Sequence, residues 1–159
     1  MIREVSGDIL LSKADVIAHG VAPSEEMTVG LAASMNQTFP GLADAFKEYC
    51  KALHPMPGDA WTWNGPGKRV ICLFTQQQAL TKGGKPGPAN LDAVKHTLYN
   101  LKKHLRKVKA RSCALSKVAT GAGGLPWAEV KTLVASELAD VEIPIFLYAD
   151  YQRGIPAAE

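Results

Sequence analysis

Apolar positions in this chain form short runs that alternate with helical stripes. The clearest stripe lies in residues 90–108, where Leu or Val recurs every three or four residues and predicts a helix packed on a sheet. Three further segments are predicted as helices, at 29–39, 42–53 and 127–138. Six apolar runs are predicted as strands, at 2–5, 15–19, 60–63, 69–75, 112–119 and 142–148.

Glycine and proline divide the chain between these elements. Pro40-Gly41 separates the first two helices, and residues 64–67, Asn-Gly-Pro-Gly, predict the turn of a hairpin or a meander. Residues 76–88 have no periodicity and are expected to form a long exposed loop. Residues 151–159 are expected to be a short C-terminal tail that is only partly ordered.

Strands that alternate with helices predict an α/β fold, because parallel neighbours need crossover helices. We expect a three-layer α/β/α arrangement with a mixed, largely parallel central sheet. A chain of 159 residues is long enough for one core, so residues 1–150 are predicted as a single domain. In such folds, ligands bind beyond the carboxyl ends of the strands.

The composition is that of an ordinary globular protein, with 47% hydrophobic and 21% charged residues. No apolar run approaches the roughly 20 residues that span a bilayer, and the first residues lack the apolar core of a signal peptide. We expect a cytoplasmic protein with no membrane partner, and a monomer. Three widely spaced cysteines favour neither a disulfide framework nor a zinc site, and no metal or other cofactor is predicted.

The net charge of +3 is small, but cations concentrate in residues 102–111. This segment is predicted either to contact a polyanion or to form a solvated helix end whose cations complement the helix dipole. Both interpretations remain open from the sequence.

The most distinctive chemistry lies in the glycine-rich residues 120–125, Thr-Gly-Ala-Gly-Gly-Leu, between a predicted strand and a predicted helix. In that position, bare backbone N–H groups and a helix dipole can point at an anion, which predicts a phosphate-binding loop. A tight connection without a ligand is the alternative. The loop contains no Gly-Lys-Thr or Gly-Lys-Ser, and no Rossmann acid follows it, which disfavours P-loop ATPases and dinucleotide dehydrogenases.

A second set of polar and small residues lies near the N-terminus. Asp8 follows the first strand, the second strand closes at His19, and a helix begins near Thr28 and Gly30. These strand ends and helix starts are expected to face one rim of the sheet. Taken alone, Asp8 would be a turn or cap residue.

Five segments taken together carry a resemblance that covers nearly the whole chain, the last being the most specific: 7–9, 15–19, 30–32, 39–41 and 120–130. In these segments the chain resembles the macrodomain family of ADP-ribose-binding modules. The resemblance implies a partner that is ADP-ribose or an ADP-ribosylated protein or nucleic acid. Within this family, the chain most resembles the branch containing terminal ADP-ribose protein glycohydrolase and the yeast-type ADP-ribose 1''-phosphate phosphatases. This narrower resemblance rests on His19 and on the sequence Cys72-Leu-Phe-Thr75.

By this resemblance, Asp8 accepts a hydrogen bond from the adenine amino group and Ile9 contributes its backbone N–H. Residues 120–125 wrap the diphosphate, and residues 22–30 approach the distal ribose. Tyr148 packs against adenine or is a core tyrosine at a strand end. The ligand-binding residues so implied are Asp8, Ile9, Ala22, Thr28, Val29, Gly30, Thr120, Gly121, Ala122, Gly123, Gly124, Leu125 and Tyr148.

The chain departs from the family where its hydrolases carry out catalysis. The distal-ribose loop has no asparagine and keeps only Gly30 of the usual glycine run. Gln76 stands where the glycohydrolase has a lysine that attacks the ribose, and Pro126-Trp127 leaves no counterpart of the aspartate that follows its second glycine loop. We therefore expect a protein that binds ADP-ribose as a reader or a divergent enzyme.

Two kinds of residue remain candidates for catalysis. His19 is the catalytic residue of the alternative function, an ADP-ribosyl hydrolase or ADP-ribose 1''-phosphate phosphatase, where it would act as acid or base. Its other interpretation is a buried histidine satisfied by backbone groups. Lys82 and Lys85 are candidate substitute nucleophiles or simply solvated lysines.

Overall fold

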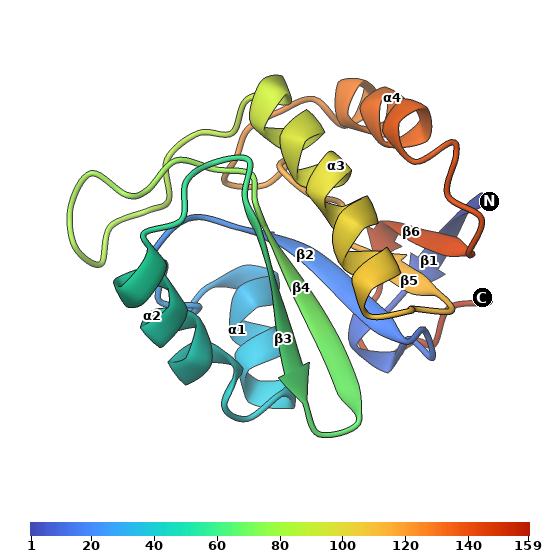
Figure 1. Cartoon of the computed structure of the whole chain (residues 1–159), viewed down its shortest axis with the longest axis horizontal. Coiled ribbons are helices and arrows are strands. Elements are labelled where there is room, and N and C mark those ends of the chain that lie inside the picture. The colour runs from blue at the N-terminus through green and yellow to red at the C-terminus, as the bar shows by residue number, and fades with distance from the viewer.

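Six strands form one sheet in the order β1-β6-β5-β2-β4-β3 (Figure 1). The computed structural model describes residues 1–159. All neighbouring strands are parallel except β3, which pairs with β4 in the antiparallel direction. The strands are β1 (Ile2–Gly7), β2 (Val16–Val21), β3 (Ala60–Gly65), β4 (Lys68–Phe74), β5 (Cys113–Leu115) and β6 (Ile145–Tyr151).

Helices cover both faces of this sheet. On one side lie α1 (Gly30–Thr38) and α2 (Leu42–Leu53), and on the other lie α3 (Leu91–Lys107) and α4 (Trp127–Glu137), as Figure 1 shows. Alternate residues of β2 enter separate cores, because successive side chains point to opposite faces of a strand. Ile17 belongs to the core beneath α1 and α2, and Ala18 to the core beneath α3 and α4. The predicted three-layer fold with a mixed, largely parallel sheet is confirmed.

Several predicted elements agree closely with the structure. The bounds of α2 are those predicted, and β3 and β4 form the predicted hairpin around Pro66 and Gly67. The loop after β4 is exposed along most of its length and is closed at its base by a bridge between Gln76 and Ala89. No helix is both long enough and apolar enough to cross a bilayer.

Two strands differ most from their predicted bounds. β5 ends at Leu115 because Ser116 carries the last ladder hydrogen bond, to Ala18, and Ala119 then turns into the left-handed region with φ 66°. β6 begins only at Ile145, because Pro144 has no N–H to donate to a ladder. It also runs further than predicted, through Tyr151.

The segment after β6 folds back onto β1 and the 3-10 turn η1 (Ile9–Leu11). The N–H of Gln152 donates to the carbonyl of Gly7 at 3.0 Å, and the N–H of Asp8 donates to the carbonyl of Ile155 at 2.7 Å. Glu159 accepts a hydrogen bond from the Tyr148 hydroxyl at 2.6 Å. The tail is therefore packed against the sheet rather than partly ordered. The division into residues 1–150 and 151–159 stays a prediction.

Candidate functional site

The carboxyl ends of β2, β4 and β5 meet around Gly20. A Cβ added there would lie 3.0 Å from Thr75 Oγ1 and 3.5 Å from the Cβ of Val118, so a larger residue would push the Thr75 side chain away from the strand end. The Thr75 hydroxyl is fully buried and has no hydrogen-bond partner. A buried hydroxyl without a partner at such an edge is a group that a polar ligand would satisfy.

The glycine-rich loop presents a run of free backbone donors. None of the N–H groups of Thr120, Gly121, Ala122 and Gly123 donates to a protein acceptor. The loop keeps its shape through carbonyls instead: Gly121 O accepts from Gly124 N at 3.0 Å, and Gly123 O accepts from Ala89 N at 3.0 Å. Consecutive unpaired N–H groups form an anion-binding concavity.

The backbone of this loop requires glycine at some of its glycine positions and not at others. A Cβ at Gly123 would lie 2.7 Å from the carbonyl oxygen of Ala119, and Gly124 adopts φ +76°, so both positions require glycine. A Cβ at Gly121 would meet nothing within 4 Å, and its backbone is not left-handed. Folding therefore does not require Gly121 to be a glycine. Leu125 is half-buried and completes the loop with its N–H on Ala119 O at 3.0 Å.

Two helices begin at this edge without a side-chain cap. The N-cap of α4 is Pro126 and the N-cap of α1 is Val29, and neither makes a capping hydrogen bond. By contrast, Asn90 caps α3 at 2.8 Å. The uncapped N–H groups carry the positive ends of two helix dipoles, which favour an anion at the loops before them.

The predicted distal-ribose loop is shaped by a residue that the sequence did not single out. Glu25 Oε1 accepts a hydrogen bond from the N–H of Ala22 at 2.7 Å, and burial raises the pKa of Glu25. Met27 is buried and anchors the loop. Thr28, Val29 and Gly30 are exposed, as a ligand-contacting segment requires. No periodicity or motif marks Glu25, so sequence reasoning had no signal for it.

Asp8 is a cap residue, as one of its two predicted interpretations has it, and its contact with adenine stays a prediction. Its Oδ1 accepts from the N–H of Leu10 at 3.0 Å, which caps η1, and its Oδ2 accepts from the N–H of Gly154 at 2.8 Å. Only 5% of Asp8 is exposed. The adjacent N–H of Ile9 has no protein acceptor. Each carboxylate oxygen keeps a second lone pair, so this corner still offers an acceptor beside a free donor.

Two tyrosines lie near Asp8. Tyr148 is buried in the core beneath α1 and α2, and burial followed by its hydrogen bond to Glu159 raises its pKa. Its packing against adenine stays a prediction. Tyr151, which the sequence analysis did not single out, is 46% exposed, and burial and the negative charge of Asp8 raise its pKa. Its position only became evident once β6 proved to extend through it.

His19 lies in the interior. Its side chain is 1% exposed, its Nε2 lies 3.5 Å from Cys72 Sγ, and burial lowers its pKa to about 4. These features favour a neutral, packed histidine, and the predicted catalytic role stays a prediction. Gln76 is also buried, with its Nε2 donating to Gly87 O at 3.3 Å, whereas Lys82 is exposed in the loop beyond it. No three His, Cys, Asp or Glu side chains come together as metal ligands would.

Comparison with solved structures identifies this arrangement. The macrodomain of Thermus aquaticus DarG superposes with a TM-score of 0.82 at 24% identity, covering 93% of this chain and 97% of that one. The chain has the macrodomain fold. Thermosipho africanus DarTG in complex with ADP-ribose matches this chain with a TM-score of 0.79 at 19% identity, over 96% of this chain and 42% of that chain. No protein-family model matches the sequence.

A curated relative extends the comparison. A DNA ADP-ribosyl glycohydrolase of Thermus aquaticus is 26% identical over 150 residues, which cover 93% of this chain and 41% of the relative. The chain spans less than half the length of the curated relatives that it matches. The predicted resemblance to the macrodomain family is confirmed at the level of fold, and the narrower branch stays a prediction.

The burial of His19 predicts a pH-dependent stability. Its pKa is lower in the folded than in the unfolded chain, so the unfolded state binds more protons between about pH 6.5 and pH 4. The stabilisation is complete above about pH 6.5 and declines as the pH falls towards 4, by about 3 kcal/mol in the free energy of unfolding.

Urea unfolding of wild type and of His19→Leu across this range measures the effect. The wild type should lose more stability on acidification than the variant, while His54→Gln, at an exposed histidine, should follow the wild type. Parallel pH curves for wild type and His19→Leu would show that His19 is not the buried neutral group described here.

Proposed function

We propose that this macrodomain binds the ADP-ribosyl group of a modified molecule and acts as a reader. The observation that carries the proposal is the run of four unpaired N–H groups at residues 120–123, which lies before the uncapped start of α4. A diphosphate needs several donors and a positive field, and both are supplied here by the backbone.

The remaining parts of the site fit the two ends of ADP-ribose. Asp8 and the free N–H of Ile9 would pair with the amino group and a ring nitrogen of adenine. The exposed residues Thr28 to Gly30, at the uncapped start of α1, would approach the distal ribose. This assignment accounts for the free donors around Asp8 and at both helix starts.

Two substitutions at the reacting end favour binding without cleavage. By the family resemblance, the glycohydrolase lysine is replaced by Gln76, whose amide is not nucleophilic and is held by Gly87. The aspartate position is Pro126, which has no side-chain acid. We propose nucleic acid as the carrier of the ADP-ribosyl group, because the curated relatives are named for ADP-ribosylated DNA.

Hydrolysis is the second candidate function, favoured by the relatives' description as glycohydrolases. It would remove ADP-ribose from an adduct, or phosphate from ADP-ribose 1''-phosphate with His19 as acid or base. The burial of His19 weighs against this, because proton transfer needs a group within hydrogen-bond reach of the substrate. Glu25, which is half-buried, and Glu26, which is exposed, are the ionisable groups of the distal-ribose loop.

Replacing Asp8 should weaken ADP-ribose binding. Asp8→Ala removes the charged acceptor for the adenine amino group, and a hydrogen bond to a charged group contributes about 1.5–3 kcal/mol, or about tenfold to a hundredfold in Kd. Isothermal titration calorimetry with ADP-ribose measures the change. Asp44→Ala, at an exposed aspartate on α2, is the matched control. Unchanged affinity in a folded Asp8→Ala protein would remove Asp8 from the site.

The contrast between Gly121 and Gly123 tests the diphosphate loop. Gly121→Ala adds a methyl group into open space, so Tm should stay unchanged while ADP-ribose affinity falls tenfold or more through contact with the ligand. Gly123→Ala clashes with the backbone of Ala119 and should lower Tm. If Gly121→Ala binds ADP-ribose like the wild type, the diphosphate does not lie over this loop.

An ADP-ribosylated oligonucleotide separates reader from enzyme. The wild type should retain the modified strand without releasing ADP-ribose, as followed by chromatography of the products. The double variant Gln76→Lys with Pro126→Asp, which restores both family residues, should release it faster than the wild type. Release of more than one molecule of ADP-ribose per molecule of wild-type protein would instead show turnover, and so establish glycohydrolase activity.

A further inference from the structure

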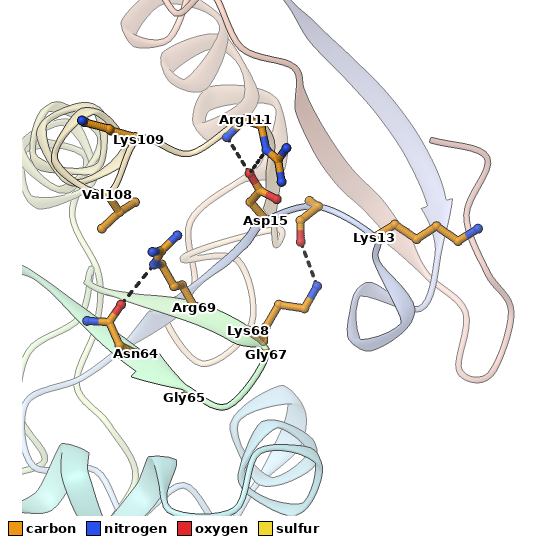
Figure 2. A pocket seen from close by; sticks show the side chains of 11 residues that line it. Lys13, Asp15, Asn64, Gly65, Gly67, Lys68, Arg69, Val108, Lys109 and Arg111 are labelled. Atoms are coloured by element: carbon orange, nitrogen blue, oxygen red, sulfur yellow. Dashed lines mark hydrogen bonds and ion pairs between the residues drawn. The ribbon is translucent and has the colours of Figure 1, made fainter.

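We propose that the starts of β2, β4 and β5 form a binding surface for single-stranded nucleic acid, at the edge of the sheet opposite to the ADP-ribose site. Because these strands are parallel neighbours, their amino ends lie together. Three segments surround a hollow of about 610 Å³ there: residues 13–15, residues 64–69 and residues 108–111 (Figure 2). β2 alone, with six residues, separates the two edges by about 20 Å.

Positive charge is concentrated in this hollow. Asp15 is the only carboxylate among its lining residues, which leaves an excess of four positive charges, whereas the whole chain has a net charge of +3. Glu159 lies beside the hollow, with its Oε1 accepting a hydrogen bond from the N–H of Lys13 at 3.0 Å, but the cations still outnumber the nearby carboxylates. An excess of this kind attracts polyanions. The five cations that line it are Lys13, Lys68, Arg69, Lys109 and Arg111.

The two arginines are oriented by their neighbours, with their outer edges free. Arg69 Nε donates to Asn64 Oδ1 at 3.1 Å, and Arg111 Nε donates to Asp15 Oδ2 at 3.3 Å (Figure 2). Their terminal guanidinium nitrogens have no protein acceptor, and 89% of the Arg111 side chain is exposed. A guanidinium held through Nε keeps two parallel N–H groups for the two oxygens of a phosphate.

The lysines have distinct parts in this surface. Lys68 Nζ donates to the carbonyls of Ser12 at 3.1 Å and Ala14 at 2.8 Å, and so fixes the segment before β2. Lys109 is exposed and adopts φ 54° just beyond the end of α3. Glycine is the residue favoured at such a left-handed position. A lysine there adds a positive charge at a position where the backbone conformation favours glycine.

A second hollow continues the first and favours single-stranded nucleic acid over other polyanions. It has a volume of about 420 Å³ and shares Asn64 and Val108 with the first. Trp61 and Tyr49 line it, stacked at 5.1 Å between ring centroids and 21° between planes. Tyr49 also stacks on Phe74 at 6.3 Å between ring centroids, so the half-buried Trp61 is the ring on which an unpaired base would stack. An acidic peptide or a lipid headgroup has no base to place there.

Fluorescence anisotropy with a short, unmodified single-stranded DNA measures this binding directly. Arg69→Gln combined with Arg111→Gln should weaken it tenfold or more at low salt. It should also reduce the slope of log K against log salt by about 1.4, since each phosphate contact on a single strand contributes about 0.7. Calorimetric affinity for ADP-ribose should stay unchanged, so the two sites are scored separately.

The matched control removes the same charge elsewhere: Arg3→Gln combined with Lys131→Gln, on β1 and α4. It should leave DNA affinity and salt slope close to those of the wild type. Equal losses in both double variants, or no binding of DNA by the wild type, would overturn the proposal. Inorganic polyphosphate that competes as tightly as DNA of equal charge would overturn the assignment to nucleic acid.

Discussion

The close approach of β2, β4 and β5 at Gly20 determines where this molecule can hold a ligand. With no Cβ at that position, Thr75 and Val118 pack against the strand end, and the loops that follow leave the sheet together. β5 ends at Leu115, and the chain continues from there into the glycine-rich loop. The carbonyls of Gly121 and Gly123 hold this loop, whereas the N–H groups of residues 120–123 stay unpaired. The packing of the strand ends therefore places these unpaired donors at the edge where the proposed ligand would lie.

The carboxylate of Asp8 links this edge to the end of the described chain. It caps η1 and also holds the N–H of Gly154, while Glu159 ties the tail to Tyr148. A carboxylate has about four acceptor sites, and two of them are occupied by these backbone donors. A ligand that donates to a third acceptor site would share the Asp8 carboxylate with the tail. The tail is thus part of the corner that the sequence assigns to adenine, and its packing limits how exposed that corner is.

The sequence predicted best where local physics decides the structure. α2 begins after Pro40-Gly41 and follows one apolar stripe, so its bounds agree with the structure. The end of β6 and the tail were placed less well, because their positions depend on hydrogen bonds between residues far apart in the chain, such as Asp8 with Gly154. Tyr151 was missed for the same reason. Glu25 was missed because no motif marks its short-range hydrogen bond with the N–H of Ala22. The burial of His19 also depends on long-range packing, against Cys72 of the neighbouring strand.

Binding and cleavage make different demands on this edge of the fold. The diphosphate contacts proposed here come from backbone N–H groups, which persist through most side-chain substitutions that leave the loop shape intact. Cleavage needs particular side chains within about 3 Å of the reacting atoms. By the family resemblance, the reacting side chains would lie at Gln76 and just after the glycine-rich loop, whereas Gly123 and Gly124 set the shape of the loop itself. The loop geometry therefore does not depend on which side chains stand at the reacting end, and the proposed binding makes fewer demands on the sequence than cleavage would.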